Sequence, residues 1–176
     1  MRTLPGGDDR GVEIRRLTAL DTAAYRALRL RGLREHPEAF TSSWEEDGAK
    51  PLSVSEARLT SDRQRHWGAF EAGTLHGIAG LELLPRPKER HKARVVGMYV
   101  APECAGAGMG AALLQAVIAD AMALGITDLV LTVTEGNGPA LGLYLRAGFR
   151  VFGTEPRAIC VEGRHLAKVH MHARLG

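Results

Sequence analysis

Cysteine is scarce in this chain of 176 residues, which contains only Cys104 and Cys160. Neither residue stands in a CxxC pair or at a Cys/His spacing typical of zinc ligands, so the sequence predicts neither a disulfide nor a metal site. Long apolar runs are missing as well, since a stretch such as residues 129–133 is far too short to cross a bilayer. We therefore expect no membrane partner, and the lack of an apolar signal segment in residues 1–11 favours a cytoplasmic protein.

A large excess of one charge is also lacking, because 23 Lys and Arg oppose 20 Asp and Glu for a formal net charge of +3. Nucleic-acid binding would call for a clustered basic stripe. The densest basic cluster, KERHKAR at residues 88–94, favours a solvated loop between two strands over an attraction for a phosphate-bearing ligand. We expect no nucleic-acid partner, a flexible leader at residues 1–11 and one domain at residues 12–176.

Apolar residues make up 45% of the chain, and their spacing predicts a mixed α/β architecture. The first half predicts a strand at residues 12–17, a helix between Asp21 and Pro37, a second short helix at 55–65, and an antiparallel meander of strands at 66–71, 74–84 and 93–100. The second half predicts an amphipathic helix that Gly125 ends, a buried strand at 128–133, a short helix from Pro139 to Gly148, and strand segments at 149–153, 158–161 and 166–172. The order β-α-α-β-β-β-α-β-α-β-β predicts an α/β protein of the α+β kind. Its strands are expected to form one mixed sheet with helices on both faces.

A glycine-rich turn, CAGAGMGAA at residues 104–112, joins the third meander strand to the amphipathic helix. Gly106, Gly108 and Gly110 leave backbone N–H groups unobstructed, and the helix N-terminus adds a positive dipole end, so the turn is suited to a pyrophosphate. A tight turn without a ligand is the alternative. The GxGxxA pattern is also compatible with a dinucleotide site, but three strands precede it and little chain remains for further crossovers.

A second motif, NGPALGLYLRAGF at residues 137–149, follows the next strand. Together with MYVAPECAGAGMGAALL at residues 98–114, it resembles the GNAT superfamily, the GCN5-related N-acetyltransferases. The family's signatures are V-x-P followed by R/Q-x-x-G-x-G/A, and N-x-x-A-x-x-L-Y-x-x-x-G-F. The chain departs from the first signature at Ala105, where Arg or Gln is usual.

The resemblance implies the GNAT fold and an N-acetyltransferase that moves an acetyl group from acetyl-CoA to the primary amine of a small molecule or protein N-terminus. It implies that the strands at Val100 and Val133 splay apart to admit the thioester. It also implies a cosubstrate site, with strand backbone for the pantetheine, the glycine turn for the pyrophosphate and Asn137 near the pantetheine. The residues expected to bind acetyl-CoA are Met98, Tyr99, Val100, Gly106, Ala107, Gly108, Met109, Gly110, Ala111, Asn137 and Tyr144.

Tyr144 is the candidate general acid for the departing thiolate, because an ordinary tyrosine, with a pKa of about 10, keeps its proton at neutral pH. It lies seven residues after Asn137, so both can face the cosubstrate from one side of a helix. A packing tyrosine is the alternative. The strand position where some relatives carry a catalytic glutamate is Thr132, so Glu82 becomes the first candidate for the base, followed by Glu135 and His91.

The acceptor pocket is expected to lie between the first helices and the loop at residues 40–46. Trp44, Glu45 and Glu46 could bind a cationic amine there, or they could be an ordinary loop with one buried aromatic residue. A non-catalytic acyl-CoA sensor and a dinucleotide oxidoreductase remain as competing functions, and a homodimer is possible.

Overall fold

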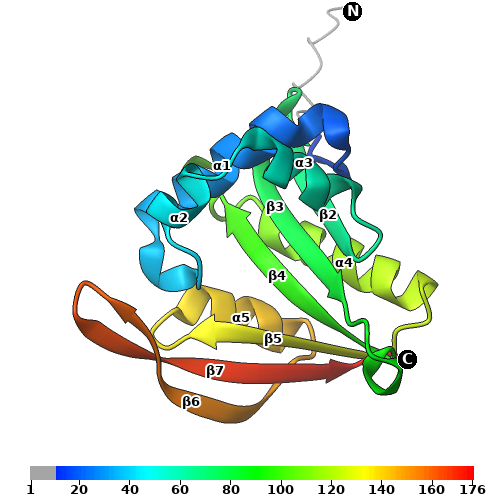
Figure 1. Cartoon of the computed structure of the whole chain (residues 1–176). Helices are drawn as coiled ribbons and strands as arrows, with labels where there is room; N and C mark the ends of the chain where they lie inside the picture. The colour runs from blue at the N-terminus through cyan, green and yellow to red at the C-terminus, as the bar shows by residue number, and fades with distance from the viewer. Residues whose placement is uncertain (1–10) are drawn as a thin grey trace, which may run out of the picture.

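The structure, a computed structural model, describes residues 11–176 as one seven-stranded sheet with helices on both faces (Figure 1). Of the leader expected at residues 1–11, all but Gly11 lies outside the described residues. The strands are β1 (Glu13–Arg16), β2 (Gln64–Glu71), β3 (Thr74–Leu83), β4 (Lys92–Val100), β5 (Asp128–Thr134), β6 (Arg150–Val161) and β7 (Arg164–Arg174). The α-helices are α1 (Thr22–Glu35), α2 (Trp44–Gly48), α3 (Leu52–Thr60), α4 (Met109–Ala123) and α5 (Gly138–Arg146).

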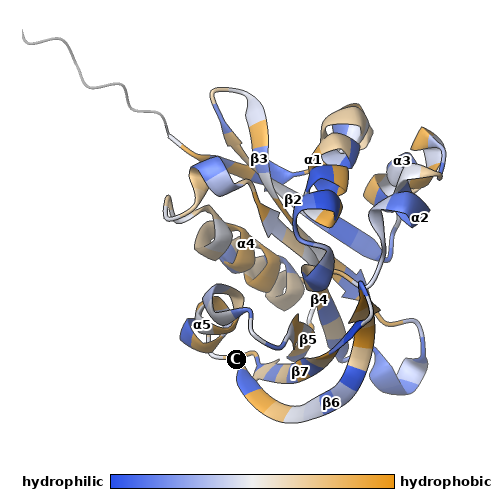
Figure 2. Ribbon diagram, turned by 90° about the vertical axis from the view of Figure 1, so that its left-hand side faces the viewer, coloured by the Kyte–Doolittle hydropathy of each residue, from blue (hydrophilic) through white to orange (hydrophobic). Residues whose placement is uncertain are grey.

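The sheet has the order β1-β2-β3-β4-β5-β7-β6, and its only parallel pair within the described residues is β4 with β5. The parallel pair arises because α4 carries the chain from the end of β4 back to the start of β5. The predicted α+β mixed sheet is therefore confirmed. Helices α1 to α3 cover one face, and α4 and α5 cover the other (Figures 1 and 2).

Two apolar clusters hold these layers together, one on each face of the sheet. Under α4, Leu113, Leu114 and Val117 are fully buried against β-strand residues such as Leu129. The other cluster, beneath α1, includes Leu17, Leu28, Ile78, Tyr25 and Tyr99. Figure 2 shows that α4, which lies beside the sheet, is coloured largely as apolar.

Several predicted boundaries were wrong, and local backbone geometry explains them. The second helix is Leu52–Thr60 and not 55–65, because Ser61 has extended φ and ψ angles and β2 already begins at Gln64. The segment after Pro37 contains a five-residue helix, α2, which begins with a capping box between Ser43 and Glu46.

The strand segments expected at 149–153 and 158–161 are one strand, β6. The register of β6 against β7 shifts between Glu155 and Ile159, and Arg157 has a φ of 52° within this irregularity. The irregular section was mistaken for a break because a bulge interrupts the alternation of side chains without ending the strand.

Candidate active site

The sheet opens between β4 and β5, where the strands pair only over Lys92–Asp128, Ala93–Leu129 and Arg94–Val130. Beyond these pairs the two strands diverge, as the family resemblance implied for Val100 and Val133 (Figure 1). A cavity of about 380 Å³ lies at the opening, a size typical of small-molecule sites. Residues 95–98 of β4 and 132–134 of β5 line it.

A bulge in β4 shapes this opening. Gly80 of β3 lies opposite Val96 and Ile78 lies opposite Tyr99, so β4 carries one extra residue at Gly97 and Met98. Gly97 has a φ of 62°, a left-handed conformation that favours glycine. Because a bulge bends a strand and redirects its groups, β4 turns Val96, Gly97 and Met98 to the cavity.

The three β4 residues expected at the pantetheine are placed differently. Met98 lines the cavity. The Tyr99 ring is buried under α1 and is not a lining residue, and its hydroxyl donates a hydrogen bond to Glu35 at 3.1 Å. Val100 packs against the α4 cluster. Only the backbone of Tyr99 and Val100 remains a candidate for contact with a ligand on the cavity side.

The glycine turn has the geometry of an anion-binding loop. Gly106 and Gly108 have φ angles of 79° and 78°, and Gly108 is the N-cap of α4. A Cβ atom at either glycine would meet no atom within 4 Å, so their conformation, and not close packing, requires glycine there. Within the described residues, the N–H groups of Met109, Gly110 and Ala111 have no acceptor, as in the free first turn of a helix. This arrangement fits a pyrophosphate.

Helix α5 brings Asn137 and Tyr144 to the same cavity, as the motif predicts. Asn137 is the N-cap, and its Oδ1 accepts a hydrogen bond from the Ala140 N–H at 3.3 Å, which leaves the side-chain NH₂ group for a ligand. The Tyr144 side chain is 6% exposed and packs edge-on against Phe149, with ring centroids 5.8 Å apart. Burial raises the pKa of Tyr144 to about 12, so the hydroxyl is protonated at neutral pH.

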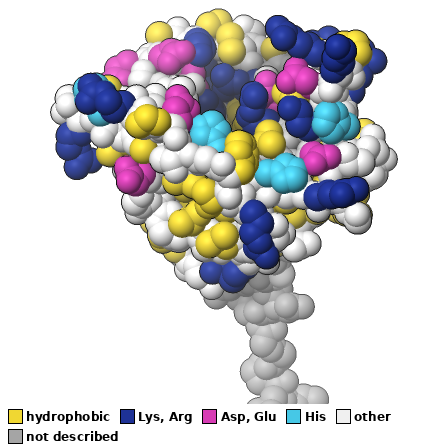
Figure 3. All heavy atoms as spheres, turned by 90° about the horizontal axis from the view of Figure 1, so that it is seen from below, with side chains coloured by type: hydrophobic (Ala, Val, Ile, Leu, Met, Phe, Trp, Pro, Cys, Tyr) yellow, Lys and Arg dark blue, Asp and Glu magenta, His cyan; other side chains and the backbone are white. Residues whose placement is uncertain are grey.

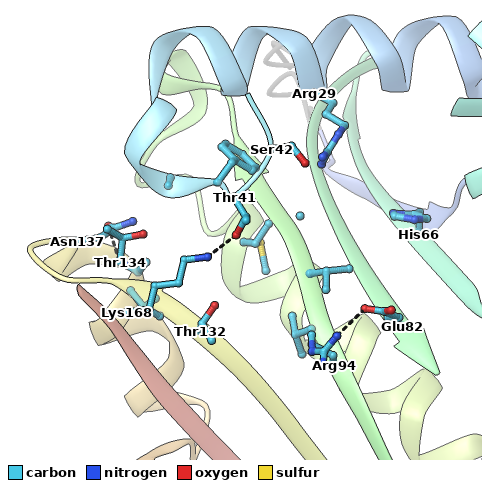
Figure 4. A pocket seen from close by; sticks show the side chains of 18 of the residues that line it. Arg29, Thr41, Ser42, His66, Glu82, Arg94, Thr132, Thr134, Asn137 and Lys168 are labelled. Atoms are coloured by element: carbon cyan, nitrogen blue, oxygen red, sulfur yellow. Dashed lines mark hydrogen bonds and ion pairs between the residues drawn. The ribbon is translucent and has the colours of Figure 1, made fainter. Parts of the chain in front are cut away.

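Glu82 also lines the cavity, and it is paired. Its position in β3 is opposite Arg94 of β4, and its Oε2 accepts a hydrogen bond from the Arg94 guanidinium at 3.2 Å (Figure 4). Thr132 lines the cavity at the strand position where a catalytic glutamate was considered. The other candidate bases, Glu135 and His91, are not among the lining residues.

His66 is a cavity residue that the sequence did not single out. It is 5% exposed, and its ring packs edge-on against Tyr25 with centroids 5.2 Å apart. Burial first, and then the charges of Arg58, Arg29 and Arg16, lower its pKa to about 4, so the imidazole is neutral near pH 7.

A methyl group on Gly80 would lie 2.8 Å from Cε1 of His66, so the glycine on the neighbouring strand makes room for the ring. No periodicity links these positions in the sequence, because they become neighbours only when β2 pairs with β3.

The cavity wall is rich in cations. Arg29, Arg58, Arg94 and Lys168 line it, against Glu82 as the one acidic lining residue of the described chain. Figure 4 shows Arg29, Arg94, Lys168 and Glu82 around the cavity. The space-filling view likewise shows Lys and Arg side chains gathered around a hollow in the surface (Figure 3).

The loop after α1 closes the cavity on one side. Residues 39–42 line it, which includes only the first part of the loop expected at residues 40–46, and Lys168 of β7 donates a hydrogen bond to Thr41 of this loop. The lining does not include Trp44, Glu45 or Glu46, which are exposed. The idea that these three residues bind a cationic amine therefore has no support in the geometry.

The arrangement of bulged strand, diverging strands, glycine turn and α5 motif agrees with the family comparison. The sequence profile of the acetyltransferase (GNAT) family matches residues 27–149. The chain belongs to the GNAT family. This confirms the resemblance drawn from the two motifs and removes the dinucleotide-binding interpretation of the glycine turn.

Several characterised GNAT proteins are similar to this chain. The L-methionine sulfoximine/L-methionine sulfone acetyltransferase of Pseudomonas aeruginosa is 35% identical over 91 residues, which are 51% of this chain and 53% of the relative. The mycothiol acetyltransferase of Geodermatophilus obscurus is 30% identical over 79% of this chain and 44% of its own length. The chain thus spans about half the length of these two relatives. The N-alpha-acetyltransferase RimI of Mycobacterium tuberculosis is 32% identical over 66% of this chain and 72% of its own length.

Solved structures agree on the fold. A GNAT-family acetyltransferase from Streptococcus pneumoniae has a TM-score of 0.81 and 25% identity, and the alignment covers 94% of this chain and 100% of that one. The protein yncA from Salmonella typhimurium, described as a putative acetyltransferase and solved with its cofactor acetyl-CoA, has a TM-score of 0.79 and 23% identity. The alignment covers 94% of this chain and 95% of that one. The GNAT fold predicted from the sequence is confirmed.

One side-chain cluster in this GNAT domain lies apart from the cavity. The Glu71 carboxylate, a ring nitrogen of His76 and the Cys104 sulfur lie within 4.8 Å of one another. The expectation of no metal site rested on sequence spacing, and these residues come together only through the fold. Burial, followed by the charges of Glu71 and Glu103, raises the pKa of the Cys104 thiol.

Among the described helices, none is long and apolar enough to span a membrane.

Proposed function

We propose that this chain is an acetyl-CoA-dependent N-acetyltransferase, in which the primary amine of a small molecule or a protein N-terminus attacks the thioester directly. The observation that carries the proposal is the convergence of Met98, Asn137 and the buried, protonated Tyr144 on one cavity between diverging parallel strands. The acetyltransferases similar to this chain act, by their names, on small molecules or on α-amines, which is the same class of reaction.

In the proposed complex, acetyl-CoA takes an extended path across the open edge of β4. The pyrophosphate contacts the glycine turn at residues 106–111, where unpaired N–H groups and the α4 dipole favour an anion. The pantetheine amides bind β4 as an added strand, because β5 leaves that part of β4 unpaired. The NH₂ group of Asn137 contacts the pantetheine, and the acetyl group enters the cavity.

The reaction then needs a neutral amine, an oxyanion donor and help for the leaving group. The amine nitrogen bonds to the carbonyl carbon, the C–S bond breaks, and the amine proton passes to a base. A backbone N–H near Tyr99 is the proposed donor to the oxyanion. The Tyr144 hydroxyl is the proposed donor to the departing sulfur. With a pKa of about 12, it holds its proton more tightly than a thiol, so it acts first as a hydrogen-bond donor to the thiolate.

The base has two candidates on the cavity wall and a third in solvent. Glu82 pairs with Arg94 and is accessible from the cavity. His66 is neutral, but a pKa of about 4 makes it a weak base. An α-amine with a pKa near 7.7–8.0 is partly neutral at physiological pH, so a water chain can complete the proton transfer. We propose Glu82 as the protein group in this step.

A thiol-release assay tests the proposal. Purified protein is mixed with acetyl-CoA and a panel of amino acids, amino acid amides, polyamines and short peptides, and free CoA is measured. Amine-dependent CoA release with formation of the acetylated amine supports the enzyme. Acetyl-CoA binding without release by any amine would favour the sensor. The same proposal includes a single domain at residues 12–176, a cytoplasmic location and a homodimer. Cell fractionation tests the location, and sedimentation tests the homodimer.

A further inference from the structure

The cations of the cavity wall are not matched by anions. Arg94 is neutralised by Glu82 across the β3–β4 pair. Arg29 of α1 and Arg58 of α3 have no such partner of their own. They share Asp47, which Arg29 contacts at 2.6 Å and Arg58 at 3.6 Å, while Lys50 contacts the same carboxylate at 2.8 Å. Lys50 also contacts Glu46 at 3.5 Å. Two carboxylates thus face three cations, and positive charge remains in excess at this end of the cavity.

Arg29 and Arg58 also keep unused hydrogen-bond donors. The Nε of Arg29 donates to Asp47, and within residues 11–176 neither terminal nitrogen of Arg29 has an acceptor. Arg58 makes only the 3.6 Å contact, which is longer than a hydrogen bond. Their side chains are 13% and 23% exposed, and within the described residues the one fully buried, unpartnered side-chain nitrogen or oxygen is Nε of Arg16. The free nitrogens of Arg29 and Arg58 are therefore open to the cavity, where an anionic ligand can accept charge-assisted hydrogen bonds from them.

The position of Arg29 ties this charge to the reaction site. A methyl group on Gly97 would lie 3.7 Å from Nη1 of Arg29, so the guanidinium lies against the β4 bulge that faces the cavity (Figure 4). Met98, the next residue, is at the opening between β4 and β5. A molecule held by Arg29 is therefore a short distance from an acetyl group on β4.

The positive charges of Arg29 and Arg58 also act on the imidazole of His66. After burial, the charges of Arg58 and Arg29 are the next largest influences that lower the pKa of His66. Other charged groups around this end of the cavity are Arg16, which also lowers that pKa, and the Glu82–Arg94 pair. The cavity end formed by α1, α3 and β2 is thus positive in potential and repels a second cation.

We propose that the acceptor is a small amine that carries an anionic group, such as a carboxylate, and that Arg29 and Arg58 bind this group. This inference rests on the proposed acetyl transfer and adds the chemical class of the acceptor. In this arrangement, the two guanidinium groups hold the anion at the α1–α3 end, and the amine lies toward Tyr144 and the β4–β5 opening. Polyamines, which carry only positive charge, are poor acceptors in the same cavity.

The test uses pairs of acceptors that differ only in the anionic group. L-Methionine, L-phenylalanine and L-glutamine are each compared with their C-terminal amides by CoA release with saturating acetyl-CoA. We expect kcat/KM for the acid to exceed that for its amide about tenfold or more, the usual effect of one charge-assisted hydrogen bond. The amide has the less basic amine and so the larger neutral fraction, which means that a preference for the acid cannot come from the amine itself.

Three substitutions to methionine locate the anion site. Arg29→Met and Arg58→Met keep the apolar stem and remove the charge, and Asp47 retains two cationic partners in each variant. Each is expected to raise KM for the acid about tenfold and to leave KM for the amide within about twofold. Arg34→Met is the matched control, because Arg34 is on α1 but packs over Trp44 and is not a lining residue. Melting temperature and acetyl-CoA affinity, measured by calorimetry, establish that each variant is folded.

The outcomes separate the inference from the proposed function. Equal or better turnover of amides or polyamines by the unmodified protein would overturn the anionic acceptor and leave the acetyltransferase standing. Equal losses for acid and amide in the Arg29 and Arg58 variants would also overturn it. If a variant does not fold, the salt dependence of KM in the unmodified protein decides: KM for the acid should rise with NaCl and KM for the amide should not. Acetyl-CoA binding with no turnover of any amine would overturn the proposed function itself.

Discussion

At the scale of single residues, Tyr144 has the properties that a donor to a leaving thiolate requires. It is fixed by packing against Phe149, it lines the cavity, and its pKa of about 12 keeps it protonated across the physiological range. Burial is the cause of the raised pKa, so the same environment that withdraws water from the hydroxyl also strengthens its hydrogen bond to a developing negative charge.

Tyr144→Phe removes only this hydroxyl and keeps the ring and its packing. We expect acetyl-CoA to bind with near-native affinity, and turnover to fall by roughly a hundredfold, which is the usual contribution of one positioned proton donor. The loss should appear in kcat more than in KM, since the hydroxyl acts as the thiolate departs. Steady-state kinetics and calorimetric titration of the same preparation measure both effects. Unchanged kcat would remove Tyr144 from the mechanism and leave solvent as the proton source.

The residues of the acceptor end could not be predicted in the same way. Asn137 and Tyr144 stand seven positions apart on one helix, so local spacing places them on one face. Arg29, Arg58 and His66 belong to α1, α3 and β2, and their approach depends on how helices pack on the sheet. Their sequence neighbourhoods show no shared period. The electrostatic character of the acceptor end therefore became visible only in the folded molecule.

At the scale of elements, the turn before α4 was predicted from its glycines because backbone conformation is a local property. Gly106 and Gly108 occupy left-handed conformations, and the N–H groups that follow are free. Strand boundaries were less predictable, as β6 shows. Its irregular pairing with β7 depends on a partner strand that the local sequence does not encode.

Gly108→Asp tests the turn as the pyrophosphate site. The substitution adds a negative charge beside the α4 N-terminus, and we expect acetyl-CoA binding to be abolished while the domain remains folded. Gly108→Ala is the matched control, because a φ of 78° strains any side chain by about 1–2 kcal/mol but alanine adds no charge. Calorimetric titration should show a much smaller loss for alanine.

The same titration has two further outcomes. Equal affinity in the aspartate variant and the unmodified protein would mean that the turn is structural only. Ala105→Arg is the converse substitution, since it restores the family's usual cation next to the glycines. It should tighten binding modestly, and chiefly at low salt, because an exposed charge pair is screened by ions.

At the scale of the whole molecule, acetyl-CoA should stabilise the fold, because the proposed site on β4 and α5 exists in the native state and not in the unfolded chain. We expect acetyl-CoA to raise the melting temperature in a thermal-shift assay in proportion to the logarithm of its concentration. NAD(H) and ATP at matched concentrations should raise it much less. A larger shift with NAD(H) would contradict the proposed cosubstrate.

Acid should destabilise the molecule through the carboxylates that join its elements, and Asp47 is the clearest case. Its side chain contacts Arg29 of α1 and Arg58 of α3, and its pKa is lowered to about 2 by hydrogen bonds from Lys50 and Arg29 that outweigh desolvation. An unfolded aspartate has a pKa of about 3.9. The folded state thus favours the ionised form, so the contribution of Asp47 is complete above about pH 4 and is lost as the pH falls toward 2.

Asp47→Asn should therefore lower the melting temperature at pH 7, because it leaves Arg29 and Arg58 without their shared carboxylate and leaves Lys50 with Glu46 alone. The difference in melting temperature between the variant and the unmodified protein should shrink steadily between about pH 4 and pH 2, because Asp47 itself becomes neutral in that range. Asp62→Asn, at an exposed position, is the control and should follow the unmodified protein throughout. Thermal unfolding of the three proteins, followed by circular dichroism across this pH range, measures the effect. A difference that stays constant down to pH 2 would show that Asp47 stabilises the fold without its charge.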